Sequence, residues 1–456
     1  MSLKVVILAA GKGTRMRSQL PKVLQPLAQQ PLLQHVVNTA STLDATQIVT
    51  VIGHGAETVQ QTIKGEHLEF ALQAEQLGTG HAVAQANDYY GENDTVLILY
   101  GDVPLTAQST LKDLLSLVDA HHPLALLTIR LADSSGYGRI VRNQHHQVQA
   151  IVEEKDATAD QKSILEVNTG IMAVKGAYLK SWLGKLSSDN AQGELYLTDI
   201  IEMCVADGFQ VHTTQPDSEI EVLGVNDKKQ LQDLERRYQR QQAEQLMRSG
   251  VTLMDAGRVD VRGQIEVGQD VSIDVNVVFE GRVKLGDNVQ IGANCIIKES
   301  VIADNTIIHA FSHIEDSQIE QACVIGPYAR LRPGTELASE AKIGNFVEVK
   351  KSKIGFGSKV NHLSYIGDTL MGAHCNIGAG TITCNYDGVN KHLTEIGEGV
   401  FVGSDSQLVA PVKLGDGATI GAGSTITKEV PAEELTLSRS KQITLKGWQK
   451  PVKKPK

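Results

Sequence analysis

The sequence predicts a doubly wound α/β domain, then a long linker helix, then a parallel β-helix. Three observations predict this order. Strand-like and helix-like segments alternate over the first half, a stretch without glycine or proline follows, and a six-residue repeat fills most of the rest. A length of 456 residues is ample for two such domains. The predicted parts are residues 1–226, 227–249 and 250–456.

The first part carries short apolar runs at residues 5–10, 48–52 and 96–100. Runs of this length without alternation are typical of parallel strands that are buried on both faces. A glycine-bearing turn follows each run, and helical segments are expected between the runs, for example at residues 32–40 and 111–119. The pattern predicts a Rossmann-like sheet with helices on both faces.

The second part, residues 227–249, is rich in Gln, Arg and Glu. Leu231, Leu234, Tyr238 and Leu246 lie at near-helical spacing, which predicts one long, mostly exposed helix that links two domains. The alternative is a helix that belongs to the first domain.

The third part shows an apolar residue at every sixth position over two stretches. One register holds Val267, Ile273, Phe279, Leu285, Ile291 and Ile297, and another holds Ile396, Val402, Leu408, Leu414, Ile420 and Ile426. Between Val267 and Gly421 there are 20 glycines, of which 13 directly follow Ile, Leu, Val or Met. An aliphatic-Gly pair in a hexad frame is typical of hexapeptide-repeat β-helices, in which three hexads form one coil. Such a core needs few aromatic residues, which agrees with an aromatic content of 4%.

Composition excludes several classes of function. The net charge of −10 argues against nucleic acid and against an anionic membrane surface as partners. The longest apolar run, residues 5–10, is far shorter than the roughly 20 residues of a membrane span, and it is also too short for a signal peptide. The five cysteines form no CxxC pair, so a reduced, cytoplasmic protein is expected.

A first group of chemically suited residues follows the first predicted strand. The turn after it contains Gly11, Lys12 and Gly13, and such a turn offers backbone N–H groups to phosphate oxygens. Arg15 and Lys22 add positive charge beside the turn. Asp102 follows the strand at residues 96–100, at the edge where open α/β sheets bind ligands, and a carboxylate there suits Mg²⁺.

The string from Leu8 to Met16, together with Pro21-Lys22, resembles the signature of the sugar-nucleotide pyrophosphorylases. The resemblance implies that a sugar-1-phosphate oxygen attacks the α-phosphorus of a nucleoside triphosphate while Arg15 and Lys22 neutralise charge. It also implies Asp102 and Asn226 as the Mg²⁺ ligands, although Asn226 alone would look like a helix cap. Because the loop at residues 73–80 resembles the uracil-reading loop of this family, the nucleotide would be UTP. Glu153, preferred over its neighbour Glu154 only by motif alignment, would contact an N-acetylated sugar. The implied nucleotide and sugar contacts are Leu8, Ala9, Ala10, Gly11, Lys22, Gln73, Gly78, Thr79, Tyr100, Gly101, Asp102, Gly138, Glu153, Asn168 and Asn226.

A second group lies within the repeats. Arg332 and Lys350 are 18 residues apart, one full coil, and His362 follows 12 residues later. Two stacked cations make an anion site, and a nearby histidine can act as a general base. A lone histidine in such a repeat could equally be a solvated turn residue.

End to end, the chain resembles the bacterial family of bifunctional uridyltransferase/N-acetyltransferases that synthesise UDP-N-acetylglucosamine. This compound is a cell-envelope precursor. The strings that carry this resemblance include residues 99–104, 326–334, 344–348 and 376–388. The resemblance implies that the β-helix is left-handed and that it acetylates glucosamine 1-phosphate with acetyl-coenzyme A. The N-terminal domain would then join N-acetylglucosamine 1-phosphate to UTP. It further implies a homotrimer with acetyl sites between subunits.

The same resemblance assigns the acetyl site. His362 would take the proton of the attacking amine, and Arg332 and Lys350 would hold the sugar phosphate, with Tyr365, Asn376 and Glu348 orienting the sugar or the base. The implied acetyl-coenzyme A contacts are Ala379, Asn385, Tyr386, Ser404, Ala422 and Arg439.

Two alternatives stay open. The β-helix could serve only for oligomerisation or regulation beside a single nucleotidyltransferase activity, or the whole chain could be a non-catalytic assembly subunit. The lysine-rich tail at residues 446–456 could be a solvated end or could contribute to a neighbouring acetyl site.

Overall fold

The computed structural model describes residues 2–453 and divides into two compact units, residues 1–238 and 239–456. The division falls within helix α8 (Lys228–Arg248), which lies where the sequence predicts a helix over 227–249. Its first half packs Leu234 into a small core with Met16 and Leu32. In its second half the side chain of Gln239 exchanges hydrogen bonds of 2.9 and 2.7 Å with the backbone of Val261.

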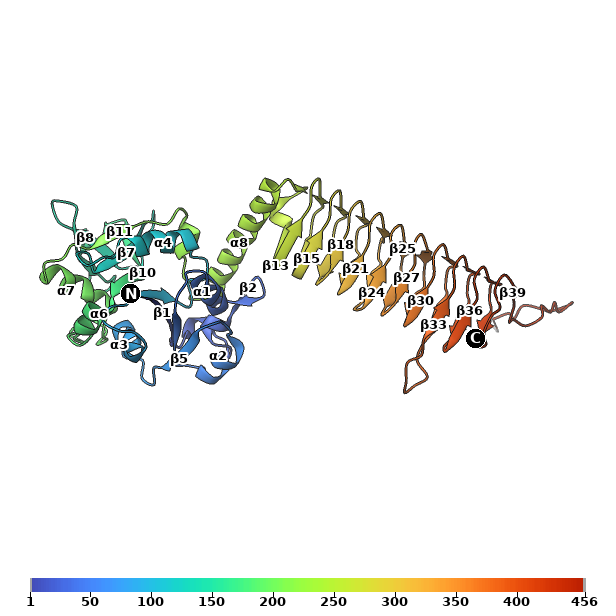
Figure 1. The fold of residues 1–456 in the computed structure, drawn as a ribbon, viewed down its shortest axis with the longest axis horizontal. Coiled ribbons are helices and arrows are strands. Elements are labelled where there is room, and N and C mark those ends of the chain that lie inside the picture. Colours follow the sequence, from blue (N-terminus) through green and yellow to red (C-terminus); the bar gives the residue numbers. More distant parts are fainter. Residues whose placement is uncertain (1, 454–456) are drawn as a thin grey trace. The chain divides into compact units, whose positions relative to one another are not determined.

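The N-terminal unit is built on a mixed sheet with strand order β11-β7-β10-β6-β1-β4-β5 and a β8–β9 hairpin attached to β10 (Figure 1). The strands are β1 (Leu3–Ala9), β4 (Gln47–Ile52), β5 (Leu68–Leu72), β6 (Thr95–Tyr100), β7 (Leu124–Arg130), β8 (Arg139–Arg142), β9 (Val148–Val152), β10 (Glu166–Lys175) and β11 (His212–Thr214). Strand β1 pairs in parallel with β4 and β6, as predicted. Strand β10 runs antiparallel to both β6 and β7. The sequence did not predict this, because an apolar run does not encode its own direction.

Helices cover both faces of this sheet. They are α1 (Leu32–Ser41), α2 (Ala56–Thr62), α3 (Thr79–Ala84), α4 (Gln108–Ser116), α5 (Ala159–Lys162), α6 (Gly176–Leu183) and α7 (Ile200–Ala206). Alternate residues of β1 point to opposite faces. Val5 and Ile7 join one core with residues of α1 and α4, whereas Val6 and Leu8 join another with residues of α3, α6 and α7. This double coverage explains the unbroken apolar runs of the sequence.

The C-terminal unit is a β-helix whose strands pair in parallel with those of the neighbouring coils. Lys342 pairs with Lys359 and Arg330 with Glu348, so one coil spans 17 or 18 residues. The members of both predicted hexad registers are buried, except Val267, which is half-buried. The hexapeptide pattern therefore predicted the architecture correctly. The left-handed sense stays a prediction.

One face of the β-helix is a sheet of 11 strands and the other two faces form a sheet of 17 strands. The first consists of β12 (Thr252–Leu253), β14 (Ser272–Ile273), β16 (Gln290–Ile291), β19 (Ile307–Ile308), β22 (Val324–Ile325), β25 (Lys342–Asn345), β28 (Lys359–His362), β31 (Asn376–Ile377), β34 (Phe401–Val402), β37 (Thr419–Ile420) and β39 (Leu435–Thr436). The second consists of β13 (Val259–Val267), β15 (Val277–Leu285), β17 (Ile296–Lys298), β18 (Val301–Ile302), β20 (His313–Glu315), β21 (Ser317–Ile319), β23 (Arg330–Leu331), β24 (Thr335–Leu337), β26 (Glu348–Lys350), β27 (Lys353–Ile354), β29 (Tyr365–Gly367), β30 (Thr369–Met371), β32 (Ile382–Cys384), β33 (Thr394–Ile396), β35 (Gln407–Val409), β36 (Val412–Leu414) and β38 (Thr425–Ile426).

A polar hairpin loop interrupts the repeat between β32 and β33, and Figure 1 shows a loop projecting near β33. Tyr386 and Lys391 form its backbone bridge, and an ion pair of 2.7 Å joins His392 to Asp387. Insertions in solenoids commonly form binding loops.

No helix among residues 2–453 is both long and apolar enough to cross a membrane. All five cysteines are unpaired with one another, and four of them are buried. The last three residues of the lysine-rich tail lie outside the described residues.

Candidate functional site

The first candidate site lies where β1 and β6 end side by side. Leu8 pairs with Tyr100, and the Gly101 amide donates to the Leu8 carbonyl at 2.9 Å. The turn after β1 and the turn after β6 therefore open at the same edge of the sheet. This is the edge at which open α/β sheets place their ligands.

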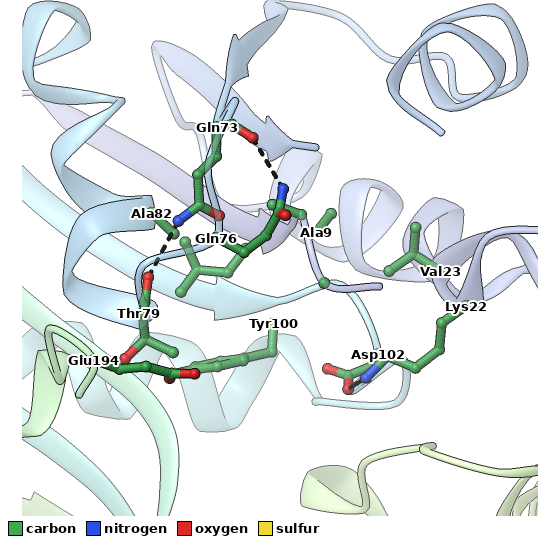
Figure 2. A pocket seen from close by; sticks show the side chains of 14 residues that line it. Ala9, Lys22, Val23, Gln73, Gln76, Thr79, Ala82, Tyr100, Asp102 and Glu194 are labelled. Atoms are coloured by element: carbon green, nitrogen blue, oxygen red, sulfur yellow. Dashed lines mark hydrogen bonds and ion pairs between the residues drawn. The ribbon is translucent and has the colours of Figure 1, made fainter. Parts of the chain in front are cut away.

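A cavity of about 230 Å³ lies at this edge, as Figure 2 shows. Ten of the fifteen predicted nucleotide and sugar contacts line it: Leu8, Ala9, Ala10, Gly11, Lys22, Gln73, Gly78, Thr79, Tyr100 and Asp102. Val23, Gln76, Ala82 and Glu194 complete the lining and were not predicted. Gly101, Gly138, Glu153, Asn168 and Asn226 do not line this cavity.

A network of charged and polar groups lies on the Lys22 side of the cavity. The Lys22 ammonium group forms an ion pair with Asp102, and the two side chains point toward one another in Figure 2. Lys22 also donates to the Asn226 Oδ1 atom at 3.2 Å, and Arg15 donates to the same oxygen at 2.9 Å. Four predicted residues from three distant parts of the chain thus meet at one point.

Asn226 does not cap helix α8. Asp227 does so, because its carboxylate accepts from the backbone N–H of Gln230 at 2.8 Å. The side-chain oxygen of Asn226 is instead the acceptor of Arg15 and Lys22. The structure therefore disfavours the helix-cap reading of this residue.

The donor set around Lys22 fits Mg²⁺. Asp102 and Asn226 each offer an oxygen to the ammonium group of Lys22, and Mg²⁺ prefers oxygen ligands. Within residues 2–453 no group of three or more His, Cys, Asp or Glu side chains is arranged to hold a metal. Mg²⁺ usually takes one or two protein ligands and fills its remaining positions with water and substrate phosphates, so two protein oxygens are consistent with such an ion.

The predicted uracil-reading loop packs tightly before α3. Gln73 is buried, and its side-chain amide donates to the Gly78 carbonyl at 3.2 Å, which holds the loop closed. Gln76 is half-buried, lines the cavity, and donates to the Gln73 carbonyl at 3.2 Å. Gln76 lies within the loop at residues 73–80 but was not among the predicted contacts, because spacing alone does not say which of two glutamines faces a ligand.

Glu194 reaches the cavity through a contact that sequence reasoning missed. The backbone of Leu195 pairs with Leu77 and Gly80 through two hydrogen bonds of 2.8 Å. Gly78 has φ +115°, and a Cβ atom there would lie 2.5 Å from the Leu195 carbonyl, so only glycine fits this close approach. Pairing between segments more than 110 residues apart leaves no local signal.

The three predicted sugar residues lie together beside Tyr100. The backbone N–H of Asn168 donates to the Gly138 carbonyl at 2.8 Å, and a Cβ atom at Gly138 would lie 3.4 Å from Glu153. Burial raises the pKa of Tyr100, and the carboxylates of Glu153 and Asp102 add to this. Tyr100 therefore connects the sugar residues to the Asp102 side of the cavity.

Glu153 and Glu154 differ in their partners. Glu154 forms an ion pair of 2.6 Å with Arg139, which lowers the pKa of its carboxyl group. Burial raises the pKa of Glu153, whose carboxylate accepts from Thr198 at 3.3 Å. Because Arg139 already occupies Glu154, the geometry supports Glu153 as the carboxylate available to a sugar.

The second candidate site lies on the β-helix, where predicted residues stack in a column. Asn345 pairs with His362 in the parallel ladder. Backbone hydrogen bonds continue the stack: Gly380 N to the His362 carbonyl, Asp405 N to the Ala379 carbonyl at 2.7 Å, and Gly423 N to the Ser404 carbonyl at 2.8 Å. The His362 column therefore consists of Asn345, His362, Ala379, Ser404 and Ala422.

Arg439 joins the far end of this column, because its guanidinium group donates to the Ala422 carbonyl at 2.8 Å. Coils stack at about 4.8 Å, so His362 and Ala422, three coils apart, are about 14 Å from each other along the column. An extended chain-like ligand could follow this line. Four residues predicted to contact acetyl-coenzyme A and the predicted base thus share one corner of the β-helix.

A group of cationic side chains lies on the face next to the His362 column, at the end of that face opposite the column. Arg332 stacks over Lys350, as the 18-residue spacing predicted, since the Arg332 amide donates to the Val349 carbonyl. The nearby Lys391 ammonium group lowers the pKa of Lys350, with burial and Arg332 adding to the effect. Arg332 also forms an ion pair of 2.8 Å with Glu348. Lys391 was missed because it lies in the inserted loop, outside the repeat arithmetic.

The remaining predicted residues are divided between two faces. Tyr365 lies over Gly367, where a Cβ atom would be 2.4 Å from its hydroxyl, and Asn385 donates to Asp368 nearby. Tyr386 follows in the exposed loop. Asn376, by contrast, lies on the 11-stranded face, paired with Lys359 and Phe401. A single chain therefore does not bring Asn376 together with the cations.

Family models match both units. A MobA-like NTP transferase domain matches residues 5–166, a GMPPB C-terminal domain matches residues 261–356, and a bacterial transferase hexapeptide of six repeats matches residues 393–428. Among solved structures, UDP-glucose pyrophosphorylase complexed with UDP-glucose matches 52% of this chain and 98% of that chain, at 16% identity and a TM-score of 0.44. The family models indicate a nucleotidyltransferase domain joined to a hexapeptide-repeat transferase domain.

Curated relatives narrow this class. The Bifunctional protein GlmU of Hydrogenovibrio crunogenus is 71% identical over 453 residues, which cover 99% of this chain and 100% of that protein. The protein of the same name from Stutzerimonas stutzeri is 58% identical over 454 residues and covers both chains fully. The chain belongs to the bifunctional GlmU family of uridyltransferase/acetyltransferases.

Proposed function

We propose that this enzyme makes UDP-N-acetylglucosamine in two steps, each on a different part of the chain. Residues 250–456 transfer an acetyl group from acetyl-coenzyme A to glucosamine 1-phosphate. Residues 1–226 then join the product to UMP from UTP and release pyrophosphate, and residues 227–249 link the two. The observation that supports this assignment is that each part gathers its own predicted set: Lys22 with Asp102 and Asn226 in one, and the His362 column in the other.

In the uridylyl step a phosphate oxygen of the sugar 1-phosphate attacks the α-phosphorus of UTP, and the bond to pyrophosphate breaks. The nucleophile is already an anion, so the step needs positioning and charge neutralisation rather than a general base. Arg15 and Lys22 supply positive charge at the cavity edge. Asp102 and Asn226 would hold Mg²⁺, which supplies further neutralisation of the phosphates when bound.

Binding of the sugar and the base would use the other walls of this cavity. Gln73, Gln76, Gly78 and Thr79 form the wall that suits a uracil edge, since amide groups can both donate and accept. Gly138, Glu153 and Asn168 would hold the N-acetylated sugar beside Tyr100.

In the acetyl step the amine nitrogen of glucosamine 1-phosphate attacks the thioester carbonyl. A C–N bond forms, the C–S bond breaks, His362 takes a proton from the amine, and that proton passes to the departing thiolate. The cofactor arm would follow Ala379, Ser404 and Ala422, with Arg439 near its phosphates. Asn385 and Tyr386 in the inserted loop would contact the same molecule. Arg332, Lys350 and the additional Lys391 would hold the sugar phosphate.

A homotrimer would complete the acetyl site. On one chain the column, the cations and Asn376 occupy different corners and faces of the β-helix. A second copy that packs beside the first could bring such separated residues around one substrate. We also propose a cytoplasmic location.

The decisive experiment is a coupled assay on the intact protein with glucosamine 1-phosphate, UTP and Mg²⁺, with and without acetyl-coenzyme A. We expect UDP-N-acetylglucosamine only when acetyl-coenzyme A is present. A parallel reaction with EDTA should accumulate N-acetylglucosamine 1-phosphate and stop there. If that acetylated intermediate never forms, yet is converted when supplied directly, the β-helix is a scaffold and the acetyl half of the proposal is wrong.

A further inference from the structure

Asn345 is the one polar side chain among residues 2–453 that hydrogen-bonds the ring of His362. Asn345 lies on β25, one coil before His362 on β28, and the two residues pair in the parallel ladder. The Asn345 Oδ1 atom lies 3.0 Å from the His362 Nδ1 atom. The ladder fixes the two backbones against each other, so the contact does not depend on a flexible loop.

The chemistry of this contact determines the tautomer of the ring. An amide oxygen can only accept a hydrogen bond, so the ring nitrogen that faces it must carry the proton. With Nδ1 protonated, the neutral imidazole has its free lone pair on Nε2. A general base needs such a lone pair directed at the proton that it removes.

We infer that Asn345 is a positioning residue of the acetyl step: its side-chain oxygen accepts from Nδ1–H of His362 and thereby keeps Nε2 as the base. The inference rests on the proposed role of His362. It adds a residue that acts through the histidine and touches no substrate itself.

Other charged groups near the ring do not provide this function. Lys342 lies on β25 and Lys359 on β28, the two paired strands. Glu348 and Lys350 lie on β26 and the titratable Tyr365 on β29, the strands that follow them in the chain. None of them forms an ion pair with His362 in the part of the chain that the structure describes. Glu348, the carboxylate of this group, pairs with Arg332 instead.

The test compares Asn345→Ala, Asn345→Asp and His362→Ala in acetyl-transfer assays over a pH series. We expect Asn345→Ala to lower kcat about 10- to 100-fold while KM for acetyl-coenzyme A changes little. Asn345→Asp keeps an acceptor at the same place, so it should recover part of kcat. Its negative charge favours the protonated ring, so the acidic limb of its pH profile should move to higher pH.

Ser339→Ala is the matched control. It removes another side-chain hydrogen bond between coils, from the Ser339 hydroxyl to Glu320 at 2.9 Å, at a different corner. It should leave kcat and the pH profile unchanged, and all variants should retain uridylyl transfer.

If Asn345→Ala keeps full kcat, or if Asn345→Asp shows neither recovery nor a shifted limb, the inference is wrong. If either result is found while His362→Ala is inactive, the role of Asn345 is overturned and the role of His362 as the base stands. An active His362→Ala overturns the proposed base itself.

Discussion

The two candidate sites assemble their charged residues by different means. In the N-terminal sheet, Lys22 and Asp102 neutralise each other at the edge of a cavity, and the uncharged side chain of Asn226, 204 residues from Lys22, accepts a hydrogen bond from the lysine. On the β-helix, three cationic side chains lie close together: Arg332, Lys350 and Lys391. The repeat stacks His362 over its neighbours coil by coil. The sheet site is therefore determined by how distant segments meet, and the β-helix site by the period of the sequence. Independent sites should respond to different substitutions.

The largest expected effect is on the sheet site. Asp102→Asn removes the carboxylate that pairs with Lys22 and would hold Mg²⁺, so uridylyl transfer should fall about 10³-fold. Raising the Mg²⁺ concentration should recover part of the rate. Acetyl transfer measured on the same sample should be unchanged, as should both activities of the exposed control Asp113→Asn. Equal loss of both activities in a folded protein would mean that the sites are coupled.

The reciprocal change is His362→Ala. Loss of the base should lower acetyl transfer about 10²-fold or more and leave uridylyl transfer intact. His309→Ala replaces another exposed histidine on the β-helix and should affect neither rate. Acetyl transfer that survives His362→Ala at the wild-type rate would contradict the comparison between the two sites.

A smaller effect is expected for Lys391→Met. Because Lys391 lies against Lys350 in the cation group, its loss should raise KM for glucosamine 1-phosphate about 10-fold with a smaller change in kcat. The pKa of Lys350 should rise toward its ordinary value when this neighbour is removed. Lys428→Met, at an exposed position, is the control, and an unchanged KM for Lys391→Met would exclude this lysine from the phosphate site.

The smallest expected effect concerns stability near the sugar residues. Burial, with Glu202 and Asp156 nearby, raises the pKa of Asp199 to about 6. A carboxyl group whose pKa is raised in the folded state binds its proton more tightly there. The wild-type protein therefore loses stability as the pH rises from about 4 to about 6. Asp199→Asn should stabilise the N-terminal unit by about 1 kcal/mol at pH 8, allowing for solvent screening, and by almost nothing below pH 4.

Thermal unfolding at pH 8 and at pH 4 measures this difference. The exposed Asp189→Asn is the control at both pH values. A gain for Asp199→Asn that is the same at both pH values would show that titration of Asp199 is not its cause.

Local patterns in the sequence were enough to predict most of the β-helix. Each coil contacts only the next, so a spacing of 18 residues placed Arg332 over Lys350 directly. The same arithmetic did not find Asn345 as a partner of His362, although the two lie 17 residues apart. It failed at Lys391 because the inserted loop breaks the period on which the arithmetic depends.

The sheet site was predicted less completely. The Gly-rich turn, Lys22 and Asp102 were identified by motif and by their place after apolar runs. Glu194 and Gln76 were not, because the first enters through backbone pairing with Leu77 and Gly80 and the second differs from Gln73 only in orientation. Resemblance suggested Asn226, and only the structure distinguished its contact with Lys22 from a helix cap.

The sequence by itself predicted the class of each domain, a long helix over residues 227–249 and most of the candidate residues, because periodicity and motifs are local properties. The tertiary structure decided which of these residues meet. It set the antiparallel direction of β10, the pairing of Glu154 with Arg139 that leaves Glu153 available, and the hydrogen bond between Asn345 and His362. Contacts of this kind depend on the relative placement of distant backbone segments, and no single segment of sequence carries that information.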